Sequence, residues 1–166
     1  MSSEDSDIKK WISKLESVKK GDFDLSRDED LSIALMNLIS LEEHFYFTSM
    51  KTNDSKYLDM LNSVRNLRKN LLGKIVKNPK GEEWCISKHL LAASMRLSEV
   101  GTKELSKNNK KDSIIFFNSA FELYSLFFAI NTGIIEKKNI EVENKKDRLL
   151  QKFSSAIKKA VDCCKE

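Results

Sequence analysis

Residues that interrupt regular secondary structure are scarce in this chain, which has five glycines and one proline among 166 residues. Sheet proteins and doubly wound α/β proteins need a turn about every ten residues, and their turns draw on glycine and proline. Long helices need far fewer such residues. Because 40% of the residues are hydrophobic, the chain also has enough apolar side chains to bury a core. The sequence therefore predicts a single, compact all-α domain over residues 1–166.

Apolar residues recur at helical spacing in six segments, and no segment alternates with the two-residue period of a strand. We expect helices at about 7–20, 29–50, 55–77, 82–105, 112–131 and 143–163. Residues 112–131 hold five of the nine phenylalanines, so this segment should pair with 82–105 as the central antiparallel hairpin of a bundle of five to six helices. Residues 1–28 could form a loosely attached acidic helix and linker.

Residues 94–127 have the pattern of a helical hairpin. Along the chain, the pattern requires in turn a large residue, an apolar residue, a glycine, a turn residue, a small residue, an aromatic residue and an alanine. These positions hold Leu97, Val100, Gly101, Asn108, Ser113, Phe117 and Ala120. The pattern resembles one tetratricopeptide repeat, in which small residues let two helices approach and an aromatic side chain fills the wedge between them. Glu104 stands where the repeat has Tyr, and no second copy follows at a 34-residue offset. The resemblance implies one hairpin and not an array.

A similar hairpin occurs in HEPN-type helical domains, so the pattern fits two families. Catalytic members of the HEPN family carry an arginine followed four to six residues later by a histidine. Neither His44 nor His89 follows an arginine at that spacing. A HEPN-like fold would therefore imply a member that lacks the ribonuclease site of the family.

Motifs that perform chemistry are absent from the sequence: it has no Gly-rich phosphate loop, no Gly-x-Ser-x-Gly turn and no His-Glu-x-x-His. We therefore expect a non-enzymatic protein-interaction or assembly module, which could self-associate. Tetratricopeptide-like hairpins often present grooves to peptides. By that resemblance the interaction face should lie on 82–105, near Trp84, Lys88, Met95 and Arg96.

A metal- or cofactor-binding bundle is the first alternative. Cys85 and His89 lie four residues apart and share a helix face, and thiolate and imidazole suit zinc, copper or iron. Glu42 and His44 could complete the ligand set if their helix is a neighbour. Neither histidine follows a glutamate by three residues, as the ligands of di-iron bundles do. We favour histidines without a metal, and a metal ion is the one cofactor left open.

A nucleic-acid-binding protein is the second alternative. Arg65, Arg68, Lys69 and Lys77 lie along the basic segment 55–77 and could hold phosphates without reading sequence. No aromatic side chains lie between them, which removes the stacking signature of single-strand binders. The acidic segment 22–30 could instead neutralise them within the chain, and we favour that interpretation.

Cysteine usage and the terminal sequence bear on location. Three cysteines, two of them adjacent at 163 and 164, do not form a disulfide framework, and the acidic N-terminal residues are unlike a signal peptide. The most apolar run, 114–130, is interrupted by Asn118, Ser119 and Glu122, so a buried helix explains it better than a membrane span. We expect a cytoplasmic protein without a membrane partner.

Overall fold

The computed structural model describes Ser13 and residues 26–132. All regular secondary structure in this range is helical, which confirms the all-α fold class. The helices are α2 (Ser26–Thr52), α3 (Lys56–Leu72), α4 (Glu83–Ser106) and α5 (Lys110–Asn131). The helices expected at 7–20 and 143–163 lie outside the described residues, apart from Ser13, so the described part contains four of the expected five to six.

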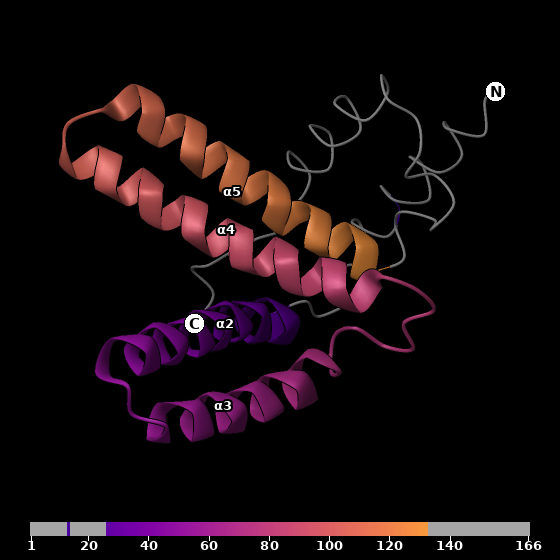
Figure 1. Cartoon of the computed structure of the whole chain (residues 1–166). Helices are drawn as coiled ribbons and strands as arrows, with labels where there is room; N and C mark the ends of the chain where they lie inside the picture. The colour runs from indigo at the N-terminus through magenta and orange to yellow at the C-terminus, as the bar shows by residue number, and fades with distance from the viewer. Residues whose placement is uncertain (1–12, 14–25, 133–166) are drawn as a thin grey trace.

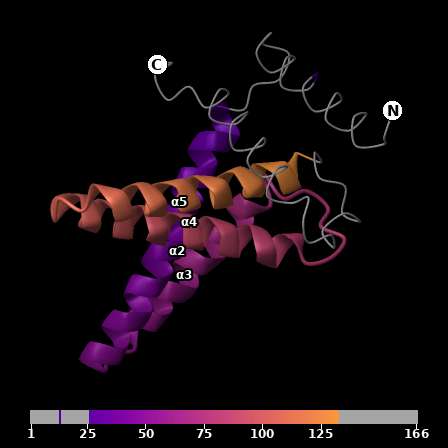
Figure 2. The same ribbon diagram turned by 90° about the horizontal axis from the view of Figure 1, so that it is seen from above.

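The four helices form two antiparallel hairpins, α2–α3 and α4–α5, and the second hairpin lies across the first (Figures 1 and 2). Within the described residues, the backbones of the two hairpins come closest between α2 and α4. The hydroxyl groups of Ser32 on α2 and Tyr124 on α5 lie 2.7 Å apart and add a buried hydrogen bond. Because the hairpins cross, each covers only part of the other.

The hydrophobic core lies where the hairpins cross, and every described helix contributes to it or leads into it. Partly buried apolar side chains, including Trp84 and Met95, pack around it. Phe128 makes edge-to-face contacts with both Tyr124 and Phe127, with ring centroids 5.1 and 5.2 Å apart. The buried cluster consists of Leu35, Met36, Leu72, Ile75, Val76, Leu90, Leu91, Tyr124, Phe127 and Phe128.

The end of α3 differs from the expectation, because the helix stops at Leu72 and not near residue 77. Gly73 caps it, and the amides of Ile75 and Val76 then both donate to the carbonyl of Leu72 in a turn. Both side chains of this turn, Ile75 and Val76, are buried in the core.

The α4–α5 hairpin has one continuous register. Asn131 donates to Ser87 Oγ over 2.9 Å near one end, and Phe117 lies against Gly101 near the other. A Cβ atom at Gly101 would lie 2.8 Å from the Phe117 ring, which is closer than two non-bonded carbon atoms approach each other. The expected close approach at Gly101 is therefore confirmed. The turn contains Asn108 with a φ of 60°, a conformation that asparagine tolerates well.

Among the described helices, α5 is long and apolar enough to cross a membrane by length and composition. It packs along α4, and its side chains Ala120, Tyr124, Phe127 and Phe128 are buried. A helix that contributes three aromatic side chains to a protein core can be as apolar as a membrane-spanning helix, so composition alone does not distinguish the two.

Candidate functional site

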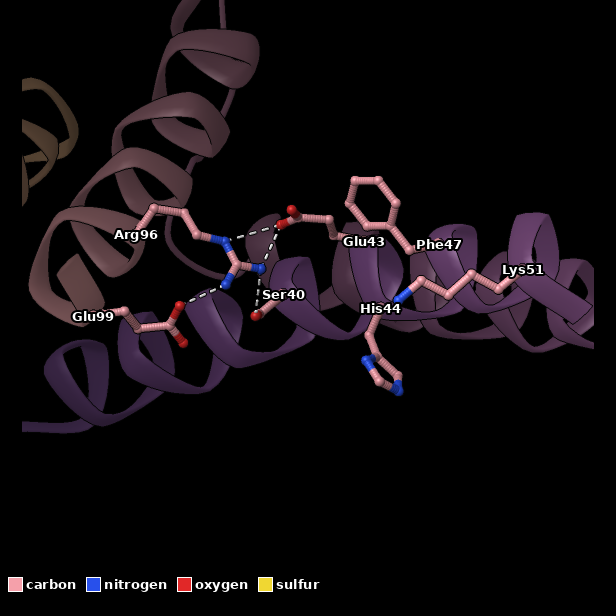
Figure 3. Close-up of a pocket in the computed structure, with 7 residues that line it drawn as sticks. All are labelled: Ser40, Glu43, His44, Phe47, Lys51, Arg96 and Glu99. Atoms are coloured by element: carbon pink, nitrogen blue, oxygen red, sulfur yellow. Dashed lines mark hydrogen bonds and ion pairs between the residues drawn. The ribbon is translucent and has the colours of Figure 1, made fainter. Parts of the chain in front are cut away.

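An open groove of about 440 Å³ lies where α2 and α4 diverge from their crossing point. Two residues of α4, Arg96 and Glu99, form one wall (Figure 3). The other wall comes from α2 and consists of Ser40, Glu43, His44, Phe47 and Lys51. We call this feature the crossing groove.

Arg96 connects the two walls of the crossing groove. On α2, its guanidinium donates to the Glu43 carboxylate and, from Nη2, to Ser40 Oγ at 3.0 Å. On α4, its own helix, it donates to the Glu99 carboxylate at 2.6 Å (Figure 3). Hydrogen bonding to Glu43 and Glu99 raises the pKa of Arg96 above its ordinary value. The ring of His44 points away from this cluster. Both carboxylates are thus engaged by Arg96, which fixes α4 against α2.

Beyond Arg96, the face of α2 that contacts α4 continues as exposed apolar surface. Ser40 and Glu43 bond to α4, and the next turns of the same face carry Tyr46, Phe47 and Met50. These three side chains are between 48% and 58% exposed, and the Tyr46 and Phe47 rings lie 5.1 Å apart. We call these three residues the α2 stripe. It is exposed because α4 turns away from α2 after the crossing.

Three of the four residues expected to form an interaction face on α4 contact other parts of the chain. Trp84 and Met95 pack against the core, and Arg96 bonds to α2. Lys88, on the same face, is half-buried.

The four candidate metal ligands do not converge. Cys85 and His89 are exposed on α4, and His44 is exposed on α2. Glu42 points toward α3, where it binds Arg68. Within the described residues, no group of three or more His, Cys, Asp or Glu side chains is placed to hold a metal ion. The proposed ligand set is therefore not assembled.

One of the four basic residues expected to form an exposed face on 55–77 is buried in the structure. Arg65, Lys69 and Lys77 are exposed, but the Arg68 residue is 3% exposed. Arg68 binds Glu42 through two hydrogen bonds, Nε to Oε1 at 2.7 Å and Nη2 to Oε2 at 3.1 Å. This arginine serves the α2–α3 contact and is not available to phosphates. Its neutralising carboxylate, Glu42, belongs to α2.

The sequence reasoning missed the α2 stripe, although a signal was present. Residues 44–47 are four consecutive ring-bearing side chains, His-Phe-Tyr-Phe. A helix presents consecutive residues to different sides, so a single core cannot bury them all. Phe45 turns inward to stack on Tyr57 of α3, and Tyr46 and Phe47 are left exposed.

Comparison with known proteins finds no matching family model, no matching curated protein and no matching solved structure. The resemblance of 94–127 to a helical repeat therefore depends on its own residues.

Proposed function

We propose that this chain is a non-enzymatic protein-interaction module and that the α2 stripe is its docking surface. The observation that carries the proposal is the continuity of the stripe with the α2–α4 interface. Ser40 and Glu43 already bind one helix, and Tyr46, Phe47 and Met50 extend the same face past the end of that contact.

An amphipathic helix of a partner protein is the occupant that this surface fits. Tyr46 and Phe47 are adjacent, and Met50 lies three to four residues after them, so the three side chains lie on neighbouring turns of one helix. Apolar residues with this spacing contact the apolar side chains of a partner helix. Aromatic side chains and methionine are enriched at such interfaces because they bury much area. Lys51 borders the stripe, which favours a partner helix with a carboxylate beside its apolar face.

The α4–α5 hairpin supports this function as a tetratricopeptide-type scaffold. Gly101 and Phe117 are in contact and Asn108 forms the turn, as the repeat pattern requires. The hairpin holds α4 rigidly, and Arg96 in turn fixes the angle at which α2 leaves α4. The α2 stripe is thereby preorganised, which reduces the entropy lost on binding.

A pair of triple variants tests the proposal. The stripe variant replaces Tyr46, Phe47 and Met50 with serine, and the control variant replaces Leu58, Met60 and Leu67 on α3 with serine. The control residues are 43–50% exposed, so both variants remove comparable exposed apolar surface. Affinity purification with the wild-type chain identifies and quantifies the proteins that bind it. Each of these proteins is then purified, and its affinity for the wild-type, stripe and control forms is measured by titration.

We expect a partner that binds the stripe variant at least about tenfold more weakly than the wild-type and control forms, since truncated anchors commonly cost this much. Light scattering after size exclusion identifies a second copy of the chain if that is the partner. The proposal is refuted if each protein that binds the wild-type chain binds the stripe variant equally well and all three forms are monomeric.

A further inference from the structure

The turn between α4 and α5 forms an apolar point at the end of its hairpin. Figures 1 and 2 agree that this turn lies away from the crossing with α2 and α3. Leu105 at the end of α4 and Ile114 and Ile115 at the start of α5 are 46–58% exposed there. We call residues 103–115 the hairpin tip.

The acidic groups of the hairpin tip are engaged within the turn. Glu104 accepts hydrogen bonds from Lys107 at 2.9 Å and from Asn109 at 2.8 Å. The bond from Lys107 lowers the pKa of the Glu104 carboxyl below its ordinary value. Asp112 accepts a further hydrogen bond from Asn109 at 2.8 Å. Lys107 thus neutralises Glu104, and Asp112 is the one acidic residue of the tip whose hydrogen-bond partner is uncharged.

The basic groups of the hairpin tip outnumber the acidic ones by four to two. Three of the four lysines make no ion pair with any residue that the structure describes, and all three are exposed: Lys103, Lys110 and Lys111. Long lysine side chains can extend beyond neighbouring apolar groups and keep their charge at a polar boundary. The tip therefore combines exposed isoleucine and leucine side chains with uncompensated positive charge.

The shape of the hairpin tip favours a lipid surface over a protein. A protein partner needs a closely matching surface, whereas a fluid layer of lipid headgroups adapts to a protruding turn. The turn is well ordered by its own bonds, because Asn109 caps α5 and Asn108 adopts a left-handed conformation. A rigid point that carries apolar side chains and lysines suits the boundary between headgroups and acyl chains.

We propose that the hairpin tip binds peripherally to anionic phospholipid bilayers, with Ile114 and Ile115 at the acyl boundary and Lys103, Lys110 and Lys111 at the headgroups. This contact does not cross the bilayer, so it differs from the membrane span that the interrupted apolar run argues against, but it would replace the expectation of a protein without a membrane partner. It also uses none of the residues of the α2 stripe.

Vesicle co-sedimentation of the full chain tests the proposal. Vesicles of phosphatidylcholine alone are compared with vesicles that contain about 30% phosphatidylserine, at about 50 and about 500 mM salt. We expect binding to the anionic vesicles at low salt, little binding to neutral vesicles, and weakening of the binding by salt.

Charge-reversal variants separate the hairpin tip from general basic attraction. The tip variant replaces Lys103, Lys110 and Lys111 with glutamate. The control replaces Lys69, Lys74 and Lys77, which are exposed on and after α3, and it has the same net charge. Each lysine near the surface is worth about fivefold in affinity. We therefore expect the tip variant to lose at least about 100-fold and the control to stay within about tenfold of the wild-type chain.

Insertion of the apolar residues is measured by fluorescence. A tryptophan at position 115 (Ile115→Trp) should be quenched by lipids brominated on their acyl chains, whereas a tryptophan at position 67 (Leu67→Trp) should not. Equal loss of binding in the two charge variants, equal quenching at the two positions, or absence of vesicle binding would each overturn the proposal. So would cross-linking of the tip to a second copy without vesicle binding. Because the stripe variant keeps an intact tip, it should bind vesicles normally whether or not the proposed function holds.

Discussion

The contact between Gly101 and Phe117 predicts an unusual response to a small substitution. Replacing a glycine within a helix by alanine normally stabilises the helix by about 1 kcal/mol. At Gly101, however, the added methyl group would lie 2.8 Å from Cδ1 and Cε1 of Phe117 and 3.3 Å from its Cγ. The ring must therefore move, or α5 must shift away from α4.

The cost of that movement decides the sign of the effect. Overpacking by one methyl group costs about 1–3 kcal/mol. The Phe117 ring is 37% exposed, so it has some freedom to turn, and the cost should fall near the middle of this range. After the gain in helix propensity, we expect Gly101→Ala to lower the free energy of unfolding by about 1 kcal/mol.

A double-mutant cycle isolates the contact. In a Phe117→Ala background the clash is absent, and Gly101→Ala should then raise the free energy of unfolding by about 1 kcal/mol. The coupling between the two positions would thus be about 2 kcal/mol. The measurement is urea unfolding followed by circular dichroism at 222 nm.

Gly73 supplies the matched control. Its φ is −63°, and a Cβ there would meet its neighbours at 3.5 Å or more, an ordinary contact distance. Gly73→Ala should therefore stabilise the protein by about 0.5 kcal/mol through the unfolded chain. If Gly101→Ala stabilises the wild-type protein as much as Gly73→Ala does, or if the cycle shows no coupling, close approach is not the reason for the glycine.

Three further substitutions have expected outcomes in unfolding experiments. Glu42→Leu leaves the buried Arg68 guanidinium without its carboxylate and should cost about 3 kcal/mol in urea unfolding, whereas Glu42→Leu with Arg68→Met should return to within about 1 kcal/mol of wild type. Burial raises the pKa of Tyr124 to about 12 from 10.0. The unfolded chain therefore loses the phenolic proton first, and stability should be complete below about pH 10 and fall by about 2 kcal/mol as the pH rises to about 12. Tyr124→Phe should remove this decline in pH-dependent unfolding curves, and Tyr46→Phe on the surface should not. Asn109→Ala removes the N-cap of α5 and should lower stability by about 1 kcal/mol, seen as a lower Tm.

Helix positions could be predicted from the sequence because they depend mainly on local periodicity. Each of the four described helices lies over an expected segment, and the turn at Asn108 lies where the repeat pattern places it. The end of α3 could not be predicted in this way. Ile75 continues the helical spacing of apolar residues in 55–77, and only the structure shows that the helix stops at Leu72, before Ile75 and Val76 enter the core.

The Arg68–Glu42 pair was within reach of sequence reasoning. Glu42 lies between Leu38 and Phe45 on the apolar stripe of its helix, which is an unusual place for a carboxylate. Arg68 lies four residues after Val64 and four before Leu72, so it too falls on an apolar stripe. Opposite charges on the buried faces of consecutive helices indicate a buried ion pair, because neither charge could be buried alone. Grouping Arg68 with the neighbouring cations hid this match.

The free surfaces of the molecule could not be predicted, because an apolar helix face does not reveal whether its partner is in the same chain. The face of α4 with Trp84 and Met95 has the pattern of a docking surface, and these side chains pack against the core of the same chain. Two hairpins that cross bury apolar side chains near the crossing and leave their ends uncovered. The α2 stripe and the hairpin tip are such ends, one past the contact with Arg96 and the other past the contact of Gly101 with Phe117. In a molecule of this shape, surfaces that bind partners should therefore be sought where one helix extends beyond the helix it packs against, and not on the most regular amphipathic stripe.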